Sequence, residues 1–292
     1  MKLFALRLRA LSLLSLMALM ALMLALGGCA THIVTTDNGL KIDTSRNAKG
    51  QDSRAMFIVI HYTVANFPLS MKILSEREVS AHYLISDEAQ PRVFRLVDEN
   101  RRAWHSGVSG WKGHRLLNAS SIGIEIVHPG FKIGPDKQRI YLPFPQAQID
   151  TLTLLLQDIV QRHQVRPDRI LGHGEVTPAY KEDPGPTFPW QQLAERGITP
   201  PWPDAQRVAQ QRVLFEGAVP DANWFQLALA QWGYVIANSG VWDEASRRVL
   251  LNFQMRYRPA NYDAQPDAES AALLRVLNNP PAPAAAAQPG QP

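Results

Sequence analysis

The sequence predicts an α/β or α+β sheet domain followed by a small domain of three helices. Continuous apolar, β-rich runs alternate with one amphipathic helix before residue 196, and three helical segments follow residue 204. Of the 292 residues, 46% are hydrophobic and 19% are charged, a balance typical of packed globular proteins. This length suits one sizeable domain together with a smaller one.

The first 28 residues have the layout of a secretory signal. A basic start precedes an unbroken apolar or small stretch over residues 10–26, and two glycines then lead into Cys29. A membrane-spanning helix is the alternative, although this stretch is at the short limit for crossing about 30 Å of hydrocarbon. Small residues before a lone cysteine resemble a bacterial lipobox. The resemblance implies that residues 1–28 are removed and that Cys29 becomes the lipidated first residue.

Acyl chains on Cys29 would anchor the product stably to a membrane. Ala30 follows, where an aspartate would resemble an inner-membrane retention signal, so we expect the outer membrane, facing the periplasm. Residues 29–54 then form a polar tether. The sequence holds no second cysteine, which excludes an intrachain disulfide and a cysteine-rich zinc finger.

The first folded domain is predicted over residues 55–200. Its first strand, residues 56–62, is a continuous apolar run of the kind that is buried on both faces of a sheet. Further strands are predicted at residues 80–85, 92–97, 122–127 and 169–173, the first two of these forming a hairpin. Apolar residues at helical spacing predict a helix over 145–164. Four prolines predict an irregular loop over 176–190.

The second domain is predicted over residues 205–279, after a proline-rich junction. Its three helices are expected at residues 223–231, 243–256 and 267–277, with Asp243 and Asp267 as N-caps. A unit of this size is close to the lower limit for an independent core, which favours a compact binding module. Residues 280–292 are rich in proline, alanine and glutamine and are predicted to be disordered.

Histidines at predicted strand ends are the first candidates for chemistry. His61 and His173 each end a strand, and Asp183 follows ten residues after His173. Two imidazoles and one carboxylate suffice to hold a catalytic zinc ion and leave the fourth tetrahedral position for water. Strand ends also hold ligands rigidly. The spacing alone leaves a structural role for both histidines open.

Five short motifs carry a resemblance to a known family. They are Ile60-His61-Tyr62-Thr63, Ser80-Ala81-His82-Tyr83, Trp104-His105-Ser106-Gly107, Ile122-Gly123-Ile124-Glu125 and Lys181-Glu182-Asp183-Pro184-Gly185-Pro186. In this order they resemble the type 2 family of zinc-dependent N-acetylmuramoyl-L-alanine amidases, and in particular its AmiD-like outer-membrane lipoproteins, over residues 55–196. The resemblance implies an α/β fold with a mixed central sheet flanked by helices. It also implies cleavage of the amide between N-acetylmuramic acid and L-alanine, with peptidoglycan or muropeptides as substrate.

The resemblance assigns His61, His173 and Asp183 as ligands of one Zn²⁺ ion per chain. It assigns Glu125 and Lys181 as the catalytic residues. Zinc lowers the pKa of bound water to about 7, Glu125 would move the proton to the leaving nitrogen, and Lys181 would stabilise the oxyanion. The alternatives are a buried structural carboxylate for Glu125 and a solvated loop lysine for Lys181.

Other side chains near these motifs have less specific signals. Trp104 and His105 lie in a glycine-bounded turn and are candidates for substrate contact. His82 alternates into a β-rich run, which favours a hydrogen-bonded core histidine over a metal ligand. His128 follows the Glu125 strand and is either a neighbour of the site or exposed.

The helical segments resemble a peptidoglycan-binding domain over residues 223–277. Leu229-Ala230-Gln231-Trp232-Gly233-Tyr234 and Val249-Leu250-Leu251-Asn252-Phe253-Gln254 carry this resemblance. Residues 257–266 depart from it, because the family has a glycine-rich turn where this chain has no glycine. The alternative is a three-helix cap on the first domain, with Trp224 and Trp232 in its core.

Two other functions compete with the amidase. One is a non-catalytic peptidoglycan-recognition lipoprotein of the same fold, and the other is a zinc peptidase that cuts within the stem peptide. The 30 basic and 26 acidic residues are spread along the chain, which gives little support to nucleic-acid binding. No heptad pattern is present in the sequence, so we expect a monomer.

Overall fold

The computed structural model describes residues 32–280, and the chain divides into two units at residue 51. The predicted signal peptide, the lipidated Cys29 and nearly all of the predicted tail lie outside the described residues. In the first unit, β1 (Ile33–Thr35) pairs antiparallel with β2 (Lys41–Asp43), and both strands are exposed. The predicted tether thus contains a hairpin that its polar composition did not indicate.

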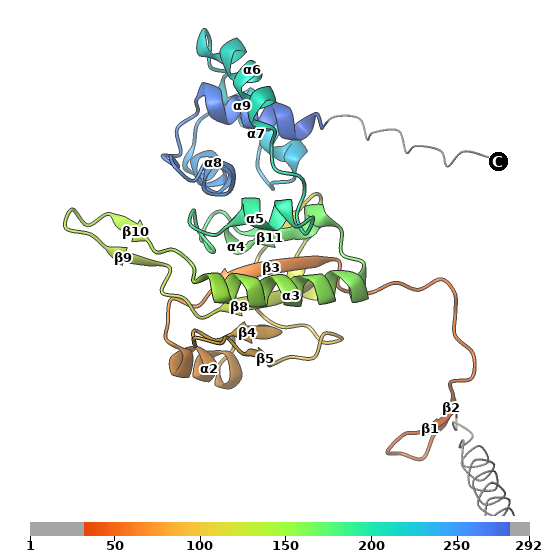
Figure 1. Cartoon of the computed structure of the whole chain (residues 1–292). Coiled ribbons are helices and arrows are strands. Elements are labelled where there is room, and N and C mark those ends of the chain that lie inside the picture. The colour runs from red at the N-terminus through yellow and green to blue at the C-terminus, as the bar shows by residue number, and fades with distance from the viewer. Residues whose placement is uncertain (1–31, 281–292) are drawn as a thin grey trace, which may run out of the picture. The chain divides into compact units, whose positions relative to one another are not determined.

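A five-stranded mixed sheet forms the centre of the second unit (Figure 1). In spatial order its strands are β11 (Ile170–Gly172), β3 (Phe57–Tyr62), β8 (Ser121–Ile126), β4 (Tyr83–Ile85) and β5 (Val93–Arg95). The first four pair in parallel, and β5 pairs antiparallel with β4 as the predicted hairpin. The predicted mixed central sheet is confirmed.

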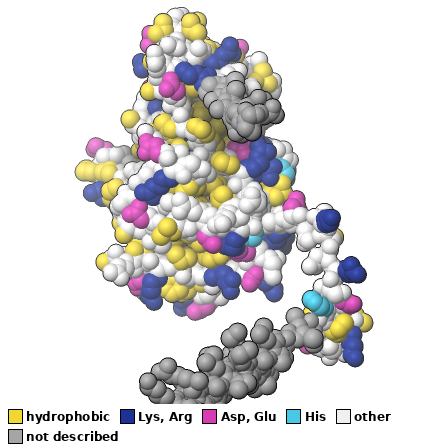
Figure 2. Space-filling view, turned by 45° about the vertical axis from the view of Figure 1, so that its right-hand side comes forward, with side chains coloured by type: hydrophobic (Ala, Val, Ile, Leu, Met, Phe, Trp, Pro, Cys, Tyr) yellow, Lys and Arg dark blue, Asp and Glu magenta, His cyan; other side chains and the backbone are white. Residues whose placement is uncertain are grey.

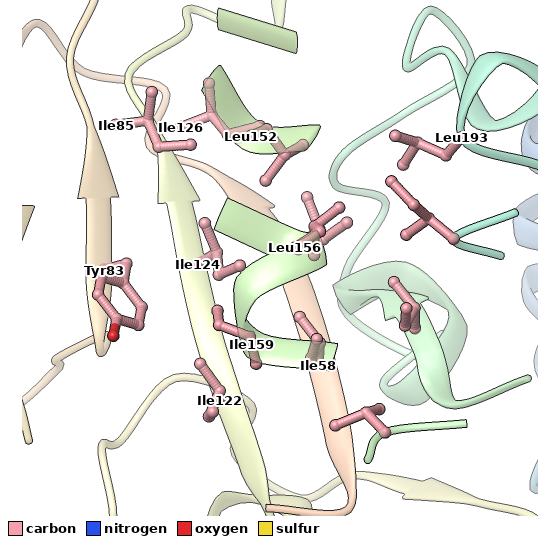
Figure 3. Packing of buried hydrophobic residues seen from close by; sticks show 14 of the residues in the cluster. Ile58, Tyr83, Ile85, Ile122, Ile124, Ile126, Leu152, Leu156, Ile159 and Leu193 are labelled. Atoms are coloured by element: carbon pink, nitrogen blue, oxygen red, sulfur yellow. The ribbon is translucent and has the colours of Figure 1, made fainter. Parts of the chain in front are cut away.

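Helix α3 (Gln146–His163) covers one face of this sheet. It confirms the helix predicted over residues 145–164. Alternate residues of β3 and β8 point to this face, because side chains alternate along a strand. The cluster joins Ile58, Ile60, Ile122, Ile124 and Ile126 to Leu152, Leu156 and Ile159 of the helix, all 0% exposed (Figure 3). The helix ends where Gln164 adopts a left-handed conformation.

The opposite face of the sheet is covered by the C-terminal helices. Phe57, Val59 and Leu171 point to this face and belong to one buried cluster with Phe225, Leu229, Leu250, Phe253 and Leu274. Trp224 and Trp232 are partly buried and pack against the same cluster. The helical part therefore packs on this face of the sheet as a cap, and its resemblance to a peptidoglycan-binding domain stays a prediction.

The helical part has four helices within the described residues, one more than predicted. They are α6 (Ala205–Glu216), α7 (Ala222–Trp232), α8 (Glu244–Tyr257) and α9 (Ala268–Asn278). The side chains of Asp243 and Asp267 accept hydrogen bonds from backbone N–H groups three residues on, at 2.7 and 2.8 Å, so both predicted N-caps are confirmed. Helix α6 has no buried residue, and its weak apolar periodicity explains why it was not predicted.

Several short elements were not predicted from the sequence. They are α2 (Phe67–Glu76), α4 (His173–Val176), α5 (Trp190–Glu195), the hairpins β6 (Gly110–Trp111) with β7 (His114–Arg115) and β9 (Phe131–Ile133) with β10 (Arg139–Tyr141), and the 3₁₀ turns Leu117–Ala119 and Pro167–Arg169. None of the helices over residues 32–280 combines the length and apolar character that crossing a membrane requires. On the face shown in Figure 2, basic and acidic side chains are interspersed with apolar ones.

A polar network around Glu99 joins the C-terminal end of α3 to strand β4 and to the loop that follows β5. Glu99 accepts a hydrogen bond from Tyr83 at 2.6 Å and from Arg162 at 2.9 Å, and it pairs with His163 at 2.8 Å. Burial by itself would raise the pKa of Glu99, but the hydrogen bonds from Arg162 and Tyr83 lower it to about 2. The carboxylate form therefore stabilises the folded chain.

Replacing Glu99 by glutamine should lower stability in a pH-dependent way. We expect Glu99→Gln to reduce the free energy of unfolding by about 1 kcal/mol near neutral pH, because charge-assisted hydrogen bonds are lost. The contribution of Glu99 is present above its ordinary pKa of 4.5 and disappears as the pH falls toward about 2. Urea denaturation across this range measures it. A deficit that stays constant down to the acid end would contradict the assignment.

Candidate metal and catalytic site

The carboxyl ends of three parallel strands bring the predicted site residues together. His61 on β3 and Glu125 on β8 are direct neighbours in the sheet register, and His173 follows the last residue of β11. Parallel strands end at the same edge of a sheet, which is the usual position of sites in such folds. Asp183 reaches this edge from the loop after α4.

His61, His173 and Asp183 form a buried triangle of ligand atoms. The Nδ1 atoms of the two histidines are 3.0 Å apart, and Oδ2 of Asp183 lies 3.2 Å from each. Zinc bonds of about 2.0–2.1 Å in a tetrahedral site place ligand atoms about 3.3 Å apart. The triangle therefore has the size and the donor atoms that a zinc ion requires.

The protonation states of these groups also suit a metal ion. Burial, and to a smaller extent His173, lowers the pKa of His61 to about 4, so its ring is neutral. Burial alone would raise the pKa of Asp183, but the two histidines hold it below its usual range. A neutral imidazole and a carboxylate are the forms that bind metals.

A chain of hydrogen bonds orients the His61 ring. Ser121 Oγ donates to the Leu117 carbonyl at 2.7 Å, so it accepts from Nε2 of His105 at 3.0 Å. Nδ1 of His105 then accepts from Nε2 of His61 at 3.0 Å, which leaves Nδ1 of His61 free toward the triangle. Gly123 makes room for this arrangement, because a Cβ atom there would lie 2.4 Å from Cγ of His105.

Glu125 places an unpartnered oxygen beside the triangle. Its Oε2 atom is buried and has no hydrogen-bond partner among residues 32–280. Burial, with a smaller contribution from Asp183, raises the pKa of Glu125 to about 8, while Lys181 acts in the opposite direction. A buried carboxylate without a partner is costly for stability, which argues against the purely structural alternative.

Lys181 is exposed and lies on the loop between α4 and Asp183. It lines a cavity of about 250 Å³ together with the triangle, Glu125 and Trp104. Sequence analysis missed the wall that Ser70, Ile73, Leu74 and Val79 provide from α2 and the residues after it. The signal for α2 was present, since Asn66 caps it by accepting from the Leu69 N–H at 3.1 Å.

The remaining candidates take different positions. Trp104 is 51% exposed and lines the cavity. His105 also lines the cavity, in addition to its hydrogen bond with His61. His82 is fully buried and its Nδ1 accepts from the Gly123 N–H at 2.9 Å, which confirms the predicted core role. His128 is buried outside this cavity, contacts the Pro143 carbonyl and stacks on Phe144.

Comparison with known proteins gives consistent matches. The family model described as N-acetylmuramoyl-L-alanine amidase matches residues 51–186. N-acetylmuramoyl-L-alanine amidase AmiD of Escherichia coli is 38% identical over 265 residues, which are 87% of this chain and 94% of that protein. A putative N-acetylmuramoyl-L-alanine amidase of Rickettsia conorii is 26% identical over 76% of this chain and 84% of its own length.

Two solved structures share the fold over most of the chain. The complex of E. coli AmiD with the substrate anhydro-N-acetylmuramic acid-L-Ala-D-gamma-Glu-L-Lys has a TM-score of 0.73 and 37% identity, covering 84% of this chain and 96% of that one. AmpDh3 from Pseudomonas aeruginosa has a TM-score of 0.74 and 36% identity, covering 82% and 98%. Both likenesses extend beyond the matched family domain into the C-terminal helices.

The buried oxygen of Glu125, unpartnered among the described residues, predicts a gain in stability when its charge is removed. Its raised pKa means that the protonated form stabilises the fold below 4.5, and that this contribution is lost as the pH rises to about 8. Glu125→Gln keeps the shape without the charge. We expect its advantage over the wild type to grow across this interval in chelator-treated protein, as followed by thermal unfolding. A variant less stable than the wild type at the alkaline end would contradict the assignment.

Proposed function

Because the chain belongs to the N-acetylmuramoyl-L-alanine amidase family, we propose that it hydrolyses the amide between N-acetylmuramic acid and L-alanine in peptidoglycan or muropeptides. The observation that carries this proposal is one cavity that contains the His61, His173 and Asp183 triangle together with Glu125 and Lys181. Family membership rests on 38% identity to a relative of which the chain covers 94%.

We infer that the triangle holds one zinc ion. The short, nearly equal separations of its three ligand atoms support this assignment, as does the absence of sulfur donors, which suits an oxidising compartment. When bound, zinc supplies a Lewis acid that makes water nucleophilic near neutral pH and polarises a carbonyl group. His105, through its hydrogen bond to His61, keeps the ligand ring in the required tautomer.

Glu125 would carry the proton through the reaction. Its buried oxygen, unpartnered within residues 32–280, lies in the same cavity as the triangle, where a carboxyl group can accept a proton from water and return it to a leaving group. It would take the proton of the attacking water and deliver it to the nitrogen of L-alanine as the carbon–nitrogen bond breaks. The products are the lactyl carboxylate of muramic acid and a free peptide that begins with L-alanine.

Lys181 would stabilise the oxygen of the attacked carbonyl. Lys181 lines the same cavity, and the ligand Asp183 lies two residues further along the same loop. A donor at a developing oxyanion contributes about 3–4 kcal/mol to lowering the barrier. The place of Lys181 in one cavity with Glu125 and the triangle supports this role over that of a solvated loop lysine.

We further propose that the enzyme acts as a monomer at the outer membrane, anchored through Cys29 and facing the periplasm. The lipobox-like run into Cys29 and the Ala30 that follows support this location. An anchored enzyme in that compartment would meet peptidoglycan directly.

Two variants should distinguish the residues that bind zinc from the residue that carries out catalysis. We expect His173→Ala to lose stoichiometric zinc, because a nitrogen ligand is removed, and Glu125→Gln to keep zinc while its turnover falls at least about 100-fold. Elemental analysis and kinetics on a muropeptide measure the two effects. Full zinc content in His173→Ala, or full turnover in Glu125→Gln, would contradict the assigned roles.

The products of digestion distinguish the competing functions. With anhydro-N-acetylmuramic acid-L-Ala-D-gamma-Glu-L-Lys as substrate, mass spectrometry should detect a free tripeptide that begins with L-alanine. Cuts between amino acids would indicate a peptidase, and an unchanged substrate would indicate a recognition protein. Chelator treatment should abolish the cleavage, and added zinc should restore it.

A further inference from the structure

One face of helix α8 contacts the segment that carries two of the proposed metal ligands. Arg248, Asn252 and Arg256 are spaced four residues apart, so their side chains project from the same side of the helix. The segment they contact runs from Gly172 to Asp183 and includes His173 and Lys181. Helix α8 belongs to the helical part, far from this segment in the sequence.

Arg256 holds the beginning of the segment. Its Nη1 atom donates to Oε2 of Glu175 at 2.6 Å, and both side chains are only 4% exposed. The same Glu175 oxygen accepts from the Gly172 N–H at 2.8 Å, next to His173. The Arg256 guanidinium also lies 3.9 Å from the centroid of the Trp190 ring. This ion pair therefore links α8 to the turn that presents His173.

Arg248 and Asn252 hold the end of the segment. Arg248 donates to Oε1 of Glu182 at 2.6 Å and to the Pro178 carbonyl at 3.1 Å. Asn252 donates to the Lys181 carbonyl at 3.2 Å. Glu182 lies between the proposed oxyanion donor and the ligand Asp183, so these contacts hold the backbone next to both.

Gly174 brings the two ends of the segment together against α8. Its N–H donates to the Asp183 carbonyl at 2.8 Å. A Cβ atom on Gly174 would lie 1.9 Å from Oδ1 of Asn252 and 3.0 Å from Cα of Glu182. Only glycine allows the helix and the segment to approach this closely.

We infer that Arg248, Asn252 and Arg256 are positioning residues of the metal site, so that the helical part completes the geometry of the catalytic domain. Residues 177–189 contain neither helix nor strand and depend on neighbouring elements for their conformation. Metal ligands must be held within about 0.5 Å of their working geometry. This inference rests on the proposed zinc site.

Zinc affinity in folded variants tests the inference. We expect Arg248→Gln and Asn252→Ala to weaken zinc binding by about 10-fold or more, the lower end of the effect of residues that orient metal ligands. Competition with a chromogenic chelator measures the affinity, and the absorption bands of the cobalt-substituted protein report the ligand geometry. Glu182 keeps its bonds from Tyr141 and Arg139 in Arg248→Gln, so this variant should fold. Arg248→Lys, which retains the charge, should recover part of the affinity.

Arg247→Gln is the matched control. Arg247 is the adjacent arginine on α8, but its guanidinium donates to Gln265 within the helical part at 3.1 Å. We expect its zinc affinity and cobalt spectrum to match the wild type. Wild-type affinity and spectra in Arg248→Gln and Asn252→Ala, even with a lowered melting temperature, would show a merely structural role and overturn the inference. A wild-type protein that binds no zinc would instead overturn the proposed metal site, and the inference with it.

Discussion

The parallel pairing of β3 with β11 on one side and β8 on the other is the constraint on which the site depends. Backbone hydrogen bonds set the register that places His61 beside Glu125 and ends β11 just before His173. Side chains from three separate stretches of sequence therefore lie together at one edge of the sheet. Isoleucines on the face toward α3 and apolar residues on the opposite face keep the strands in this register, because a one-residue slip would exchange the two faces.

Local sequence patterns predicted the helices and strands whose formation depends on apolar periodicity and on capping residues. The buried runs that became β3 and β8, the stripe of α3 and the aspartate caps of α8 and α9 follow from periodicity and capping. The position of Asp183 does not, since it lies in a loop whose conformation is set by distant contacts. Its spacing after His173 made it a candidate, and the resemblance to the family assigned it as a ligand. Helix α6 was missed because it buries no side chain, and the role of His105 beside His61 required the tertiary structure.

The proline-rich junction near residue 200 marks a change in local structure without separating two cores. Sheet residues and C-terminal helices contribute to one buried cluster, so the face of the sheet opposite α3 would be exposed without the helices. A proline-rich composition disfavours helix and strand locally, whereas burial depends on which surfaces meet in space. The same interface carries the contacts from α8 to the segment between Gly172 and Asp183, which links stability to the geometry of the site.

Gly123 shows that a position without reactive chemistry can still limit what the protein tolerates. It lies on β8 two residues before Glu125, and its missing side chain is the space that the His105 ring occupies. Even a methyl group there would displace the imidazole and, through it, the ring of His61. In directed evolution of this scaffold, a larger side chain at Gly123 would be selected against because of its volume, and a library that varied only polar residues around the cavity would overlook this position.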